Sequence, residues 1–162
     1  MKNYLFAALL ALGISSSGSA LTVGERIPDI SLPKIGSSGS FSLSSLQGKV
    51  TLVDFWGSWC IPCRASFPIY DQLRNQYQGK GFEVVGINED DQVSSAQDFL
   101  NTYVVSFTIL HDEKKEAASV FKPNNMPTSF LVDRQGKVVK VYSGFRESDV
   151  PALKQDIENL LG

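Results

Sequence analysis

The sequence predicts one α/β domain in which helices link parallel strands, followed by a hairpin and a last helix. Two apolar runs rich in β-branched and aromatic residues, 50–56 and 82–87, have the character of strands that are covered on both faces. Each run is followed by apolar residues at helical spacing, and strands that alternate with helices indicate a parallel sheet. The length of 162 residues is close to the usual size of one domain.

Two segments flank the first of these strands. Before it, the Ser-, Gly- and Pro-rich segment 21–48 contains two short apolar runs and predicts a small hairpin or edge extension. After it, apolar residues at four-residue spacing predict a helix over 62–78, with Pro68 kinking its first half and two glycines ending it.

The second half of the chain continues the alternation and then closes with antiparallel strands. The predicted elements are a helix over 92–103, a strand over 107–110, a helix over 114–121, and strands over 128–132 and 138–142. A four-residue turn joins the last two strands into a hairpin. One apolar stripe after the hairpin predicts a closing helix with Ser148 as its N-cap.

The composition is that of a soluble globular protein. Hydrophobic residues make up 43% of the chain and charged residues 20%, and 15 basic against 17 acidic side chains leave a net charge of −2. Lys and Arg form no cluster that could follow a phosphate backbone. We therefore exclude nucleic acid as a partner.

The first 20 residues have the pattern of a secretory signal peptide. A basic start precedes an apolar run over 4–14, and small residues end at Ala20, where we expect cleavage. A retained membrane anchor is the alternative, but a spanning helix needs about 20 apolar residues. We expect one domain over 21–162, soluble and periplasmic or otherwise extracytoplasmic, where disulfides persist.

The only two cysteines, Cys60 and Cys63, lie between a predicted buried strand and the start of a predicted helix. A helix N-terminus has unpaired N–H groups and a partial positive charge, which favour the thiolate of Cys60 over its thiol. Cys60 would attack a substrate disulfide, and the more shielded Cys63 would then release the product from the mixed disulfide. The pair therefore predicts a redox-active disulfide.

Two other roles for the cysteine pair have less support. A structural disulfide that closes so short a loop removes only about 2 kcal/mol of unfolded-state entropy. A closed zinc site needs four ligands, and His111 is the only histidine. We expect neither a metal nor a cofactor, and we interpret His111 as structural.

Two separate segments carry a family resemblance. Residues 53–63, Val-Asp-Phe-Trp-Gly-Ser-Trp-Cys-Ile-Pro-Cys, resemble the active-site segment of the thioredoxin superfamily, and residues 126–128, Met-Pro-Thr, resemble its cis-proline loop. Residues 64–68, the αβ insertion over 88–110 and the N-terminal extension resemble the TlpA/ResA branch of exported thiol-disulfide oxidoreductases. The resemblance implies a thioredoxin fold with an N-terminal β extension and a central αβ insertion.

The resemblance also implies an activity and a substrate site. Proteins of that branch reduce disulfides outside the cytoplasm, often those of apocytochrome c in cytochrome c biogenesis, and take electrons from a membrane thiol transporter. It implies a cis bond between Met126 and Pro127, which would face the cysteines and offer the Met126 backbone to a substrate segment. Trp59 and Pro62, beside and within the cysteine pair, would add substrate-binding surface.

Two acidic residues are candidate helpers of the cysteines. Asp54 lies within an apolar strand, where burial would raise its pKa and let it exchange a proton with Cys63, as in thioredoxin. The alternative is a structural aspartate that hydrogen-bonds local backbone. In the ResA-like proteins an acidic residue after the strand over 82–87 lies near the cysteines, and Asp91 is the best match. The alternative is a solvated acidic turn.

The residues around the cysteine pair indicate the direction of the reaction and help to weigh two rival functions. Ile61 and Pro62 bring no charge between the cysteines, which favours a reductant or mild exchanger over a strong oxidant. One rival is a thiol peroxidase, although 55–59 lacks the Pro and Thr that precede the attacking cysteine of peroxiredoxins. The other is a non-catalytic binding module on the same fold. We expect a monomer that acts on protein disulfides.

Overall fold

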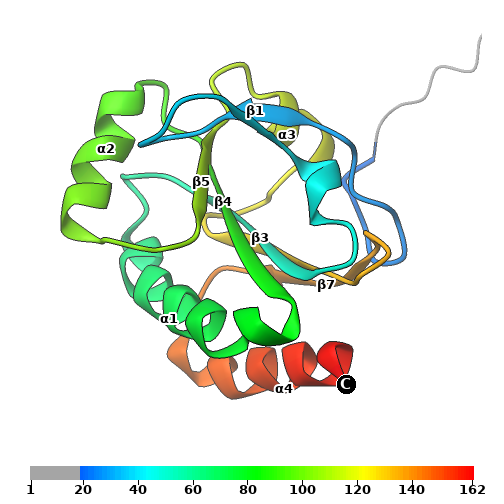
Figure 1. Ribbon diagram of the computed structural model, residues 1–162. Coiled ribbons are helices and arrows are strands. Elements are labelled where there is room, and N and C mark those ends of the chain that lie inside the picture. The colour runs from blue at the N-terminus through cyan, green and yellow to red at the C-terminus, as the bar shows by residue number, and fades with distance from the viewer. Residues whose placement is uncertain (1–18) are drawn as a thin grey trace, which may run out of the picture.

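A computed structural model describes residues 19–162, and a sheet of five strands forms the centre of the structure (Figure 1). The expected signal peptide over 1–20 lies almost entirely outside the described residues. Within the described part of the chain, no helix combines the length and the apolar character that crossing a bilayer requires.

The sheet has the strand order β5-β4-β3-β6-β7, which puts β3 in the centre as predicted. β3, β4 and β5 run parallel, whereas β6 is antiparallel to β3 and β7 is antiparallel to β6. The strands are Val50–Trp56 (β3), Phe82–Asn88 (β4), Thr108–His111 (β5), Thr128–Val132 (β6) and Val138–Ser143 (β7). The predicted order of parallel strands followed by a hairpin is confirmed.

Helices cover both faces of this sheet. They are Ile61–Tyr77 (α1), Val93–Thr102 (α2), Glu116–Phe121 (α3) and Val150–Leu161 (α4). Figure 1 shows α1 and α4 side by side on one face, and α3 on the other face together with the hairpin of Ser31–Pro33 (β1) and Ser40–Ser42 (β2). This hairpin is the predicted edge extension, and Lys34 just after β1 bridges to Leu110 of β5.

Apolar side chains form one core on each face of the sheet, because successive residues of a strand point to opposite faces. Leu52 and Trp56 of β3 belong to the core under α1, α2 and α4. Val53 and Phe55 belong to the core under α3 and the hairpin. Every residue of β3 is buried, and Asp54 is the one ionisable residue among them.

The start of the closing helix differs from the prediction. α4 begins at Val150, and Asp149, not Ser148, occupies its N-cap position. Ser148 lies in a 3-10 turn over Glu147–Asp149, where its hydroxyl contacts the Asp149 carboxylate at 3.4 Å. The prediction for Ser148 is wrong because this additional turn shifts the start of the helix.

Candidate active site

A short turn joins the end of β3 to the start of α1 and places both cysteines. Cys60 is the N-cap of α1, with extended backbone (φ −84°, ψ 105°), and its sulfur accepts the N–H of Cys63 at 3.2 Å. The N–H of Cys60 donates to the Gly57 carbonyl at 3.0 Å. Pro62 stands in the first turn of the helix, where its missing N–H costs no hydrogen bond. The two sulfurs are joined in a disulfide, with Cα atoms 5.3 Å apart.

The two cysteines differ in their access to solvent. Cys60 is 3% exposed and Cys63 is fully buried, the order expected from the sequence. By contrast, the side chains that flank Cys60 along the chain are exposed to solvent: Trp59 is 60% exposed and Ile61 is 72% exposed. The disulfide therefore lies just below a surface of exposed apolar groups, and an incoming partner reaches Cys60 before Cys63.

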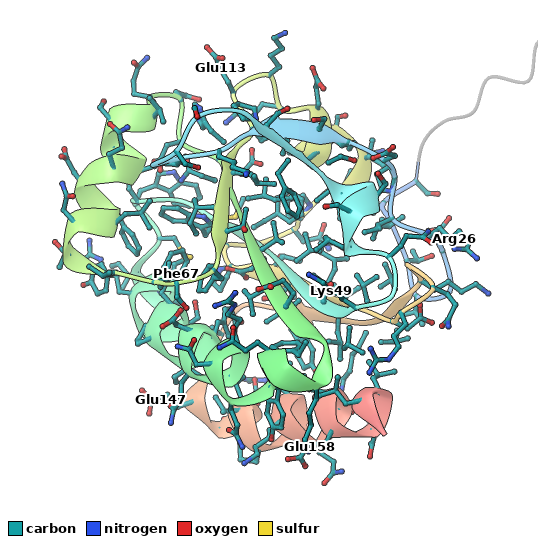
Figure 2. All side chains as sticks on the ribbon, viewed as in Figure 1. Arg26, Lys49, Phe67, Glu113, Glu147 and Glu158 are labelled. Atoms are coloured by element: carbon teal, nitrogen blue, oxygen red, sulfur yellow. A yellow bond between two sulfur atoms is a disulfide. The ribbon has the colours of Figure 1, made fainter. Side chains whose placement is uncertain are left out.

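Aromatic rings hold the first turns of α1 against the sheet. Phe67, labelled in Figure 2, lies one turn after Cys63. Its ring centroid is 4.7 Å from that of Trp56 and 5.1 Å from that of Phe99. Trp56 is fully buried, so it is a core aromatic residue at the end of β3. This packing fixes the helix start that carries the disulfide.

The bond between Met126 and Pro127 is cis, as the resemblance implied. β6 starts at Thr128, which pairs with Phe55, so the preceding loop lies beside the end of β3 and the turn to Cys60. Met126 is half-buried and packs against both cores. Within residues 19–162 its backbone forms no hydrogen bond to other backbone groups.

Asp54 is fully buried on the face of β3 that also carries Leu52 and Trp56. Its Oδ1 accepts a hydrogen bond from the Ser129 hydroxyl at 2.6 Å, and its Oδ2 has no partner among the described residues. Burial raises the pKa of Asp54 to about 8, and the hydrogen bond from Ser129 opposes this effect only in part. The carboxyl group therefore titrates near the pKa of an ordinary thiol, about 8.5.

Two hydroxyl groups, which the sequence did not predict as part of the site, extend a hydrogen-bonded chain from Asp54. Ser129 on β6 pairs directly with Asp54 across the antiparallel ladder. Tyr70 on α1 is also buried, and its oxygen lies 3.0 Å from that of Ser129. Burial raises the pKa of Tyr70 far above its ordinary value, so its hydroxyl stays protonated. Tyr70 follows Cys63 by two helical turns, and this spacing is the signal that would have located it.

The loop after β4 contacts the active-site turn through Asp90. The Asp90 carboxylate accepts the N–H of Ser58 at 3.0 Å and the hydroxyl of Ser58 at 2.7 Å. The side-chain amide of Asn88 donates to the same carboxylate at 2.7 Å. The His111 ring lies 2.8 Å from the Asp90 carbonyl, which is a structural contact. The turn is thus tied to β4 and β5 two residues before Cys60.

The side chain of Asp91, the acidic residue expected near the cysteines, points to solvent. It is 93% exposed and pairs with Lys115 at 3.8 Å. The inward position in this loop belongs to Asp90 instead, because the chain turns outward after it. Glu89 is buried as well, and burial together with the nearby Asp112 raises its pKa to about 8, against the effect of Lys115 at 3.4 Å.

The site therefore combines two chemical resources at one edge of the sheet. The cysteine pair can hold two electrons as thiols and release them as a disulfide. Asp54 can hold or release a proton near neutral pH. Among residues 19–162, no three His, Cys, Asp or Glu side chains gather where they could hold a metal ion.

Comparison with known proteins gives a family and close relatives. The AhpC/TSA family matches residues 23–141 of the chain. The chain is similar to the thiol-disulfide oxidoreductase ResA of Oceanobacillus iheyensis, at 30% identity over 125 residues, which cover 75% of this chain and 65% of that protein. The chain thus matches slightly less than two thirds of the length of this curated relative.

Two solved structures resemble the whole domain. A putative thiol:disulfide interchange protein DsbE from Chlorobium tepidum matches with a TM-score of 0.84 and 42% identity, covering 88% of this chain and 100% of that one. The thioredoxin domain of a thiol-disulfide oxidoreductase from Bacteroides vulgatus matches with a TM-score of 0.77 and 25% identity, with the same coverage. The expected thioredoxin fold is confirmed.

Proposed function

Because this chain belongs to the AhpC/TSA family and has the thioredoxin fold, we propose that it is a thiol-disulfide oxidoreductase that reduces protein disulfides through Cys60 and Cys63. The observation that carries the proposal is the Cys60 sulfur at the N-cap of α1, which accepts the Cys63 N–H and is bonded to the Cys63 sulfur. The name of the Oceanobacillus relative, a thiol-disulfide oxidoreductase, supports it.

Cys60 acts first in the reduced protein. The Cys63 N–H and the positive end of the α1 dipole favour its thiolate over its thiol. The thiolate attacks one sulfur of the substrate disulfide. A mixed disulfide with Cys60 forms, and the other substrate sulfur leaves as a thiolate.

Cys63 completes the reaction. Its sulfur attacks Cys60 in the mixed disulfide, the bond between the cysteines forms, and the second substrate sulfur leaves reduced. Asp54 takes the proton of Cys63 in this step. Its raised pKa supports this role, because proton transfer is efficient between groups of similar pKa.

The substrate segment binds between the turn before α1 and the cis-proline loop. The exposed Trp59 and Pro62 offer apolar contact next to Cys60. The backbone of Met126 is free of other backbone partners within residues 19–162, so it can pair with an extended segment. The pairing of Thr128 with Phe55 keeps this loop beside the end of β3. Backbone pairing gives affinity with little demand on the substrate sequence.

The reaction runs toward reduction of the substrate. Ile61 and Pro62 bring no charge to the thiolate of Cys60, and Asp90 brings a negative charge to the turn before it. Because of these two features, the reduced cysteine pair is less stabilised than the reduced cysteine pair of a strongly oxidising protein.

The cellular setting is proposed from the resemblance to the TlpA/ResA branch. The leader pattern over 1–20 supports cleavage and release of a monomeric domain over 21–162 outside the cytoplasm. Protein disulfides there, including those of apocytochrome c, are the proposed substrates. A membrane thiol transporter is the proposed electron donor.

Trapping with insulin tests the order of attack. Cys63→Ala keeps the attacking Cys60 but lacks the sulfur that releases the product. We therefore expect a stable mixed disulfide between Cys60 and insulin, which dithiothreitol should cleave. Cys60→Ala is the matched control and should trap none. If Cys60→Ala trapped insulin and Cys63→Ala did not, the role of Cys60 as the attacking cysteine would be contradicted. If the wild-type protein did not speed the reduction of insulin, the proposed oxidoreductase activity would be contradicted.

Hydrogen peroxide tests the peroxidase alternative on the same preparation. We expect the reduced wild-type protein to reduce insulin and to consume peroxide no faster than Cys60→Ala does, because 55–59 lacks the peroxidase pattern. Rapid peroxide consumption that depends on Cys60, without insulin reduction, would replace the proposal with a thiol peroxidase.

A further inference from the structure

Asp54 needs a route to solvent for any proton that it exchanges with Cys63. Its carboxyl group is fully buried. Among residues 19–162 its one hydrogen bond runs from the Ser129 hydroxyl to Oδ1, at 2.6 Å. The Ser129 oxygen lies 3.0 Å from the Tyr70 oxygen, so the three groups form a continuous hydrogen-bonded chain.

This chain ends beside a small pocket. Tyr70 lines a pocket of about 20 Å³ together with Tyr142, Arg146 and Leu153, between α1, β7 and α4. A space of this size is large enough for one water molecule. The hydroxyl chain therefore connects the fully buried carboxyl group of Asp54 with Tyr70, which borders a space large enough for one water molecule.

We propose that Ser129 and Tyr70 are positioning residues that relay protons between Asp54 and solvent. The proposal deepens the proposed role of Asp54 in the reaction of the cysteines and rests on it. The three relay groups come from β3, β6 and α1, and only the antiparallel pairing of Asp54 with Ser129 and the packing of α1 bring them together.

The relay moves a proton and leaves every oxidation state unchanged. After Cys63 has lost its proton to Asp54, the carboxyl group rotates to present that proton to the Ser129 oxygen. The Ser129 hydroxyl turns from Asp54 to the Tyr70 oxygen and passes its own proton there. The Tyr70 hydroxyl turns toward the pocket and gives its proton to water. Asp54 is again a carboxylate, both hydroxyls are neutral, and water has gained one proton. In the opposite direction the same steps return a proton to Asp54.

The strand neighbours of Asp54 and Ser129 bring no charged side chain to the relay. The β4 neighbour of Asp54 is Gly86, which has no side chain. Tyr142 on β7 pairs with Ser129 in the sheet, and its hydroxyl donates to Asp156 of α4 at 2.5 Å.

Charged side chains on β7, on α4 and in the segment between them pair with one another. Asp156 also pairs with Lys140 at 2.6 Å, and Arg146 at the pocket pairs with Asp149 at 3.0 Å. Burial raises the pKa of Tyr142 above its ordinary value, so this residue, like Tyr70, stays neutral. Neutral hydroxyls pass protons without holding a charge.

The proton exchange rate at Asp54 tests the relay directly. The probe is the carboxyl ¹³C signal of Asp54 in the oxidised full-length protein, identified by its absence from Asp54→Asn. Line shapes through the titration give the rate of exchange between the protonated and ionised forms. We expect Tyr70→Phe and Ser129→Ala to slow this exchange at least about tenfold. No substrate is present, so the result does not depend on the proposed oxidoreductase activity.

Tyr77→Phe is the matched control. Tyr77 lies on the same helix, is buried, and donates its hydroxyl to a carboxylate, that of Glu158. It has no place in the relay, so exchange at Asp54 should keep the wild-type rate. Ser129→Thr keeps a hydroxyl and should restore much of the rate lost in Ser129→Ala.

The outcomes separate a relay from a structural role. A structural role of Tyr70 and Ser129 shifts the titration midpoint of Asp54 or the thermal stability and leaves the exchange rate unchanged. Wild-type exchange rates in both Tyr70→Phe and Ser129→Ala would overturn the relay. Slow exchange in both, together with a wild-type protein that fails to reduce insulin, would retain the relay and remove only the proposed activity.

Discussion

At the scale of single residues, Asp54 combines a cost in stability with a raised pKa. A carboxylate in an apolar strand loses its hydration, and one hydrogen bond from Ser129 replaces only part of it. The buried Oδ2 without a protein partner is a further cost. Buried ionisable groups with shifted pKa values are typical of functional sites, because their proton is then exchangeable near neutral pH.

Asp54→Asn should stabilise the protein at neutral and alkaline pH. An aspartate in the unfolded chain has a pKa of about 3.9, whereas the folded value is raised to about 8. Between these values the unfolded chain releases a proton that the folded protein keeps, so wild-type stability falls as pH rises through this interval. Asparagine cannot ionise, and we expect its advantage to reach on the order of several kcal/mol near pH 8.

Urea unfolding across the pH range measures this difference. The free energy of unfolding of Asp54→Asn relative to wild type should rise between about pH 4 and about pH 8 and stay level above. A difference that does not change with pH would mean that Asp54 is ionised in the folded protein throughout this range.

At the scale of elements, the site depends on how the turn before α1 is held. The helix supplies N–H groups to Cys60, but the turn over 57–59 belongs to no helix or strand. Asp90, in the loop after β4, holds it by two hydrogen bonds to Ser58. The parallel pairing of β3 with β4 makes this contact possible, because it ends both strands at the same edge of the sheet.

Asp90→Ala should loosen this turn. It removes the acceptor of both the N–H and the hydroxyl of Ser58, and we expect a loss of about 1–3 kcal/mol in the free energy of unfolding. Amide hydrogen exchange at Ser58 should be faster, since its N–H loses its partner. The control is Asp91→Ala, whose side chain is exposed and should change neither quantity. Equal effects of the two variants would contradict the role given to Asp90.

At the scale of the whole molecule, one sheet separates two cores that have different tasks. The core under α1, α2 and α4 includes both cysteines and Phe67. The core under α3 and the N-terminal hairpin includes Phe121, which packs on Phe55 with ring centroids 5.0 Å apart, and contains no cysteine. Both cores support the fold, and only the first contains the cysteines and the side chains that pack on the start of α1.

Phe67→Leu and Phe121→Leu should therefore separate stability from reactivity. Both side chains are fully buried, and we expect each variant to lose about 1–2 kcal/mol of unfolding free energy. Only Phe67→Leu should change the rate at which reduced Cys60 reacts with an aromatic disulfide reagent, because Phe67 holds the start of α1 against Trp56. The checks are urea unfolding and stopped-flow absorbance. An equal change of rate in Phe121→Leu would contradict the separation.

Local patterns were enough to predict much of this protein. Continuous apolar runs predicted β3 and β4 because strands covered on both faces need apolar residues throughout. The strand, turn and helix pattern around Cys60 and Cys63 predicted a cysteine pair at a helix N-terminus, which depends only on residues close in sequence. The cis bond before Pro127 was predicted by resemblance and not from propensity, since most X–Pro bonds are trans.

Only the tertiary structure decided which polar side chains meet around the cysteine turn and Asp54. Asp90 and Asp91 are adjacent acidic residues with the same local signals, and the path of the loop after β4 turns one toward Ser58 and the other to solvent. Ser129 and Tyr70 meet Asp54 across strand pairing and helix packing that link residues 59 to 75 positions apart. Hydrogen bonds act over about 3 Å in space, whatever the separation along the chain. The sequence by itself therefore determined the cysteine pair at a helix start, but not the hydrogen bonds that join Asp54, Ser129 and Tyr70.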